Sequence, residues 1–242
     1  SFSAPYYIAA THMGETLRLI DKGAFTPAYT KRISNTENSY SIFSLYVKLK
    51  PETFSYINHT CYYQHDYNQV WNLGQYHRED WPYGMMYMTP PIEQQNEWAT
   101  HLIINCVMPF SAVEQWQDTQ TGRRGEAYAQ WKAWHEQRII DRMEEVKPGF
   151  TQCIDHVWSA SPLTVRDYYH APQGAIYGFV KDCHNPLATQ IPVATKVSNL
   201  FLTGQCVGLH GICGVPLSAI TTAEALVGKN KIIEQLQNTA PK

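Results

Sequence analysis

The sequence predicts an α+β fold in which helices flank a mostly antiparallel or mixed sheet. Three observations lead to this class: apolar and polar residues alternate over 39–50, apolar residues follow a helical period over 125–146, and a strand, a glycine-rich loop and a helix follow one another over 200–228. The 242 residues are 44% apolar, so the chain can bury a sizeable core and has room for one large domain or two small ones.

The first half of the chain supplies the predicted strands. Residues 6–11, YYIAAT, are rich in aromatic and β-branched residues and predict a buried strand, with a helix following through Leu17 to Ile20. Residues 39–50 place Phe43, Leu45, Val47 and Leu49 on one face, as a half-buried strand requires. Three further strands are expected at 57–64, 83–89 and 99–108, and their polar or proline-containing connections suit an antiparallel sheet.

Two helices are expected in the second half. The longer one spans 125–146, where its apolar stripe recurs every three or four residues, and it ends at Lys147-Pro148-Gly149. The stripe either packs against the sheet or lines a ligand pocket, and packing is the preferred interpretation. Ser161-Pro162 has the chemistry of a helix start, and this second helix must stop before Pro172.

The C-terminal third carries the most informative pattern. Residues 200–203 form a short apolar run that enters a loop with glycines at 204, 208, 211 and 214. A helix is expected from Pro216 through Val227, closed by Gly228, with Pro216 in its first turn. The free amides of Leu217 and Ser218 would then lie at the positive helix end, which suits a phosphate or a group that gains negative charge.

Two cysteines and a histidine stand close together in this loop. Cys206, His210 and Cys213 have the spacing C-x3-H-x2-C without a second half, so we expect no metal site. The two cysteines also lack the C-x-x-C spacing of a redox pair. The six cysteines of the chain are therefore expected to be free, buried thiols.

Composition excludes several classes of partner. The net charge of -2 and the absence of a basic stripe argue against nucleic acid binding. The apolar runs are far shorter than the roughly 20 residues that span a bilayer, and residues 1–12 lack the pattern of a secretory signal. We expect a cytoplasmic protein, with a peripheral membrane contact as an open alternative.

The C-terminal pattern resembles a known family. Residues 199–228, NLFLTGQCVGLHGICGVPLSAITTAEALVG, resemble the closing FAD-binding motif of the phytoene dehydrogenase family, which includes carotenoid isomerase-like and retinol saturase-like proteins of the flavin amine oxidase superfamily. Residues 161–179 resemble the segment upstream of that motif, and YYIAATH resembles the strand that leaves the FAD domain for the substrate domain. Residues 21–150 match only in general pattern.

The resemblance implies an FAD-dependent oxidoreductase that desaturates, saturates or isomerises a long apolar polyene. Gly204 and Gln205 would approach the pyrophosphate or ribityl chain, although many flavoproteins carry an acid where Gln205 stands. The helix from Val215 would point at the flavin ring. The complete cofactor-binding set implied is Gly204, Gln205, Gly214, Val215, Pro216, Leu217, Tyr177 and Gly178.

Other residues have a functional and a structural interpretation side by side. His210 is the catalytic candidate, through a hydrogen bond to substrate or flavin, and its alternative is a loop histidine with satisfied hydrogen bonds. Arg166 and Asp167 either take part in charge chemistry near the polyene or form an ion pair on an exposed helix face. An apolar substrate tunnel is expected to draw on Phe43, Tyr62, Tyr87, Met88 and Trp98, for which core positions are the alternative.

One family feature has no match. No strand is followed by GxGxxG, because the early glycines, Gly14 and Gly23, lie in no such motif. We therefore expect the C-terminal part of a longer protein, with a returning strand at 1–12, a substrate-binding domain at 13–170, the closing FAD segment at 171–230 and a tail at 231–242. Its partners would be an apolar small molecule and the missing N-terminal half of the FAD domain, and the chain alone would be inactive. The alternatives are a non-catalytic module that binds an apolar ligand, and a structural or oligomerisation domain.

Overall fold

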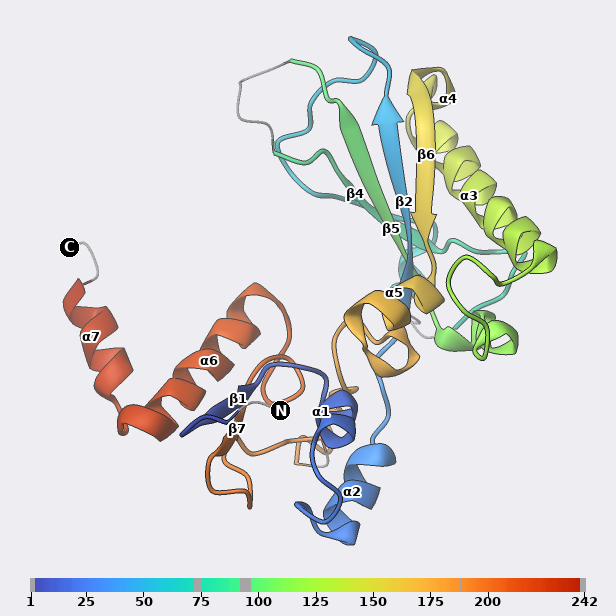
Figure 1. Cartoon of the computed structure of the whole chain (residues 1–242). Coiled ribbons are helices and arrows are strands. Elements are labelled where there is room, and N and C mark those ends of the chain that lie inside the picture. Colours follow the sequence, from blue (N-terminus) through green and yellow to red (C-terminus); the bar gives the residue numbers. More distant parts are fainter. Residues whose placement is uncertain (1–2, 72–74, 92–96, 188, 240–242) are drawn as a thin grey trace. The chain divides into compact units, whose positions relative to one another are not determined.

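A computed structural model describes residues 3–71, 75–91, 97–187 and 189–239 (Figure 1). The chain forms two compact units: unit 1 consists of Ser1–Ser39 and His170–Lys242, and unit 2 of Tyr40–Tyr169. The two sheets and the helices beside them make this an α+β protein, as the sequence predicts.

Unit 2 contains a five-stranded antiparallel sheet with the strand order β3-β4-β5-β2-β6. Its strands are β2 (Ser41–Leu49), β3 (Cys61–Gln64), β4 (Gly84–Met88), β5 (His101–Met108) and β6 (Ile154–Ala160). The four strands expected in this part of the chain are all present, with shorter bounds than predicted. The sequence analysis missed β6, which pairs with β2.

One face of this sheet packs against helix α3 (Glu126–Val146), as Figure 1 shows. Alternate residues of β2 and β5 point to the helix and are buried, among them Phe43, Leu45, Leu102 and Ile104. The helical stripe meets them with Trp131, His135, Ile139 and Met143. Core packing of the stripe, the preferred interpretation, is therefore correct.

His135 lies at the centre of this core and has no exposed surface. Its Nδ1 donates to the Trp131 carbonyl at 2.7 Å, so its Nε2 accepts from the Tyr76 hydroxyl at 2.6 Å. Phe43 and Trp81 pack around the ring. Burial lowers the pKa of His135 from 6.5 to about 4, so the ring is neutral at pH 7.

The segment after β6 forms the predicted second helix, α5 (Pro162–Tyr169). Its start is capped by Ser161, whose Oγ accepts from the Leu163 amide at 3.2 Å. Asp167 on this helix pairs with Arg166 and with the buried Arg124. Although burial raises the pKa of Asp167, hydrogen bonds from Thr121 and Arg166 outweigh it and hold the pKa below its usual value. Arg166 and Asp167 thus belong to an ion-pair cluster, as the structural alternative expects, but both side chains are half-buried and not exposed.

Unit 1 joins the two ends of the chain. Strand β1 (Tyr7–Ala9) pairs in parallel with β7 (Leu200–Leu202), and Ile8 lies opposite Phe201. The strand near the start of the chain and the strand near Leu202 thus lie side by side in one sheet. The helices of the unit are α1 (Met13–Leu19), α2 (Pro27–Ser34), α6 (Gly211–Val227) and α7 (Lys231–Thr239).

In the described parts of the chain, the remaining helical turns are α4 (Phe150–Cys153) and four 3-10 turns at Tyr67–Gln69, Phe110–Ala112, Glu114–Trp116 and Pro172–Gly174. The unit boundary lies after Ser39, whereas the sequence-based division placed residues 13–39 with the sheet. Met13, Phe25 and Ile33 pack instead in one core with Leu200 and Leu202. The substrate-binding and FAD-binding roles expected for the two parts of the chain stay predictions, because the packing of a core does not identify a ligand.

Candidate functional site

The turn that follows β7 holds helix α6 through a chain of hydrogen bonds. Gly204 takes a positive φ of 93°, and its amide donates to Ser218 Oγ at 2.9 Å. Thr222 Oγ1 donates to the Leu202 carbonyl at 2.9 Å, one helical turn further on. Small polar side chains therefore fix the helix on the strand, and Gly204 lies at the point where the chain turns between them.

Helix α6 begins earlier than the sequence predicts. It starts at Gly211 with His210 at the N-cap, so Pro216 lies inside the helix and not in its first turn. The expected role of the Leu217 and Ser218 amides at the helix end is therefore wrong. The amides without an intrahelical partner belong to 210–213, and the side chain of the N-cap residue His210 does not cap them.

Two glycines in this region are required by close packing. A Cβ on Gly214 would lie 2.3 Å from the Leu209 carbonyl oxygen, so even alanine would force the loop backbone to move. A Cβ on Gly178, which has a φ of 69°, would lie 2.8 Å from Cys206 Sγ. The 171–179 segment thus passes close to the C-terminal loop at Gly178, and the loop passes close to the start of α6 at Gly214.

The structure also brings together two side chains that the sequence singles out. The rings of Tyr177 and His210 lie 4.3 Å apart between centroids, at 31° to one another. His210 is exposed at the start of α6, and Gln205 is half-buried in the loop. Tyr177, Gly178, Gly204, His210 and Gly214 thus form one neighbourhood at the loop. Val215, Pro216 and Leu217 are exposed within the helix, one turn or more past its start.

The two faces of α6 are unusual in chemistry. Its buried residues are the small Gly214, Ser218 and Thr222, which lie four apart on the face toward β7. Apolar side chains point outward, and Ile212 is 94% exposed. Helix α7 adds the exposed Ile233 and Leu236. An apolar face left uncovered in this way is typical of a surface that meets a ligand or another chain segment.

The cysteines differ in burial. All six are free, but Cys183 and Cys213 are exposed, which corrects the expectation that all six are buried. Cys206 is buried beside Gly178, and burial raises the pKa of its thiol. Within residues 3–71, 75–91, 97–187 and 189–239, no three His, Cys, Asp or Glu residues are grouped as metal ligands.

In the described parts of the chain, no single helix has both the length and the apolar content to cross a membrane. Helices α6 and α7 taken together meet both criteria, but they are bent by 120° at the break between them.

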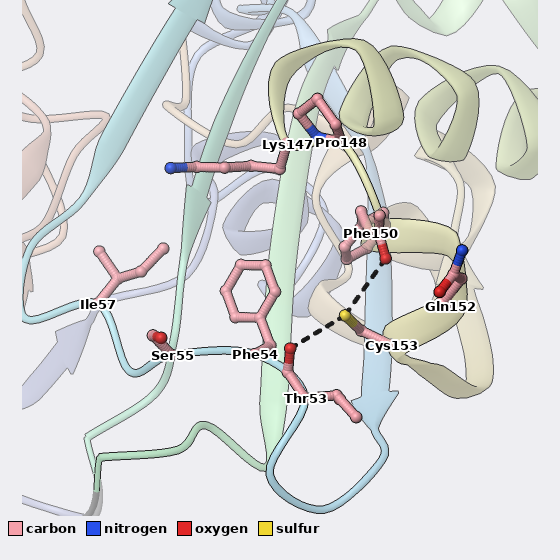
Figure 2. A pocket seen from close by; sticks show the side chains of 10 residues that line it. Thr53, Phe54, Ser55, Ile57, Lys147, Pro148, Phe150, Gln152 and Cys153 are labelled. Carbon is pink, nitrogen blue, oxygen red and sulfur yellow. Dashed lines mark hydrogen bonds between the residues drawn. The ribbon is translucent and has the colours of Figure 1, made fainter.

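Unit 2 contains an open cavity that the sequence did not predict. Figure 2 shows it between the segment after β2 and the turn from α3 to α4, with a volume of about 660 Å³. Phe54, Ile57 and Phe150 supply apolar lining, and the Lys147 side chain extends from the turn toward the side on which Ile57 lies. No sequence motif marks it, because its residues come from two segments about 90 positions apart that meet only in the folded chain.

Comparison with known proteins finds sequence similarity over about half of the chain. No protein family model matches the chain. It is 30% identical to the all-trans-retinol 13,14-reductase of Danio rerio over 124 residues, and 28% identical to that of Homo sapiens over 120 residues. These matches cover 50% and 48% of the chain and 20% of each relative, so the matched region spans about a fifth of the length of these relatives. The chain is thus a distant, partial homologue of all-trans-retinol 13,14-reductases, which supports in part the resemblance to retinol saturase-like oxidoreductases.

Proposed function

We propose that this chain is part of an FAD-dependent oxidoreductase that acts on an apolar polyene, and that unit 1 supplies the closing segment of its FAD-binding domain. The parallel pairing of β1 with β7 carries the proposal. Strands from opposite ends of the chain form the start of a parallel sheet, and β7 leads through a glycine turn into a helix, which is the arrangement that the family resemblance implies.

The residues around the turn fit such a cofactor. The uncapped amides of 210–213 offer donors and a positive helix end to a group that carries negative charge. Gly204 and Gln205 offer a turn that a ribityl or pyrophosphate group can approach, while Tyr177 and His210 stand beside it. When bound, FAD would supply the hydride or electron transfer, and the chain's own residues would hold and orient it.

The exposed apolar surfaces of unit 1 support the proposal that a further segment of protein covers them. A parallel sheet is ordinarily covered on both faces and built from more than two strands, yet β1 and β7 form a pair and Ile8 is 55% exposed. We propose that the N-terminal half of the FAD domain adds strands beside β1 and covers the outward face of α6. A membrane surface would meet the same apolar side chains and is the alternative occupant.

The sheet face of unit 2 that lies away from α3 supports the proposal of an apolar substrate. Tyr46 lies opposite Ile103 on β5 and Trp158 on β6, and these form one cross-strand row on the face away from α3. Tyr46 and Trp158 are 43% and 51% exposed. Of the tunnel candidates, Phe43 and Tyr87 are buried, which favours their core alternative, whereas Tyr62 on β3 is exposed.

The test compares two proteins. The 242-residue chain should purify without flavin, and the longer protein that includes the N-terminal half should carry FAD and convert a polyene such as retinol. Flavin absorbance and product analysis measure both properties. A longer protein that binds retinol but neither holds FAD nor converts the polyene would favour the non-catalytic binding module.

A further inference from the structure

We propose that the cavity of Figure 2 binds a small amphiphilic carboxylic acid, with Lys147 at the carboxylate and Phe54, Ile57 and Phe150 around the apolar part. Every lining residue belongs to unit 2, and none belongs to the cofactor set of unit 1. The inference is therefore independent of the proposed FAD chemistry.

The cavity is lined by apolar side chains together with the polar side chains of Thr53, Ser55, Gln152 and Lys147. Phe54 and Phe150 meet edge to face, with ring centroids 6.1 Å apart. Cys153 Sγ donates to the Thr53 carbonyl at 3.2 Å, which ties the two walls together, and the Cys153 carbonyl accepts from the Lys50 amide at 2.8 Å. A ligand in this cavity meets carbon surface beside the polar side chains of Ser55 and Gln152, a mixture that suits an amphiphilic molecule.

One positive charge stands at the opening. Lys147 is the only charged side chain among the ten lining residues, all of which are described. Two acidic residues lie in the preceding helical turn, and both have partners other than Lys147. The Glu144 carboxylate accepts from the Gly149 amide at 2.6 Å and the Thr151 amide at 2.7 Å, and Glu145 pairs with Arg142. Among the described ion pairs, none involves Lys147.

This combination selects the class of ligand. A carboxylate can pair with the Lys147 ammonium while its chain displaces water from the half-buried Phe54 and Ile57, behind which Phe150 is already buried. A neutral alcohol gains the free energy of apolar burial but forms no ion pair. A cation would be repelled by the Lys147 ammonium. A single ammonium group balances one negative charge, which matches a monoanion.

The experiment titrates the 242-residue protein with decanoate and with decanol below micelle-forming concentrations, followed by heteronuclear NMR. We expect saturable shifts at the cavity residues and tighter binding of the acid. Lys147→Met should weaken decanoate binding about threefold to fivefold, as the loss of a partly exposed ion pair predicts, and leave decanol binding unchanged. Lys147→Arg should keep the preference for the acid.

Lys132→Met is the matched control, because Lys132 lies on α3 outside the cavity lining. Phe54→Ser should weaken both ligands while the dispersion of the spectrum confirms folding. Equal decanoate affinity for the Lys147→Met variant and the unchanged protein would overturn the proposal, as would the absence of saturable shifts. Neither result depends on whether the longer protein binds FAD.

Discussion

His135 should make unit 2 sensitive to acid. The ring is neutral and buried in the folded protein, with a pKa of about 4, and it regains an ordinary pKa of 6.5 on unfolding. The unfolded chain therefore binds a proton more readily between these two values, so the free energy of unfolding falls as pH decreases from 6.5 toward 4. The contribution of neutral, buried His135 to the free energy of unfolding is complete above pH 6.5 and is lost below about pH 4, the pKa of the folded state.

The magnitude follows from the two pKa values. Each tenfold difference in proton affinity corresponds to about 1.4 kcal/mol, so the full loss is about 3 kcal/mol, of which about 2 kcal/mol is reached by pH 5. That is a large fraction of the stability of an ordinary domain. His135→Leu removes the titrating group and also two hydrogen bonds, so this variant should be less stable at pH 7 but lose less stability on acidification.

The assay uses a natural reporter. All seven tryptophans lie between residues 71 and 158, so tryptophan fluorescence during urea unfolding follows unit 2. The stability difference between the unchanged protein and the His135→Leu variant should shrink by about 2 kcal/mol from pH 7 to pH 5. His12→Leu is the control, because burial also lowers the pKa of His12 to about 4 but this residue belongs to unit 1. Parallel pH profiles for the unchanged protein and the His135→Leu variant would refute the reasoning.

The remaining predictions concern the loop and the buried ion pair. In the longer protein, Gly214→Val should lower FAD occupancy and activity together, because its side chain collides with the Leu209 backbone, whereas Cys206→Ser and Cys213→Ser should leave flavin binding largely intact. Absorbance per protein compares the three variants, and the reverse order would support a role for the thiols. Arg124→Met should destabilise unit 2 by about 3 kcal/mol in urea unfolding, because the partly buried Asp167 loses a partner. Asp167→Asn should restore part of that loss, and an additive double variant would contradict the pairing.

The sequence predicts most elements whose signal is local. The alternation over 39–50 identifies the buried face of β2, and the helical period over 125–146 identifies the buried face of α3. Both elements are found where these patterns lie. The pattern of β6 is weaker because His156 and Trp158 are exposed on an edge strand, so no apolar alternation marks it. Helix α7 was expected as a tail, although apolar residues recur at 232, 233 and 236.

The start of α6 and the cavity depend on contacts that the local sequence pattern does not reveal. Gly211 and Gly214 make the start of α6 look like loop, and Pro216 imitates a first-turn proline, so the predicted helix start was too late. The reason for Gly214 is the backbone of Leu209, a tertiary contact that no spacing rule reveals. The cavity around Lys147 depends in the same way on segments that meet only after folding.

The central claim is that unit 1 forms part of an FAD-binding domain. Its most direct test is the absorbance spectrum of the proposed longer protein, in which an N-terminal half precedes this chain, with the released cofactor identified by mass spectrometry. The account predicts stoichiometric FAD in that protein, and reduced occupancy when Gly214 is replaced by valine. A folded longer protein that carries no flavin and takes up none when FAD is added would contradict it.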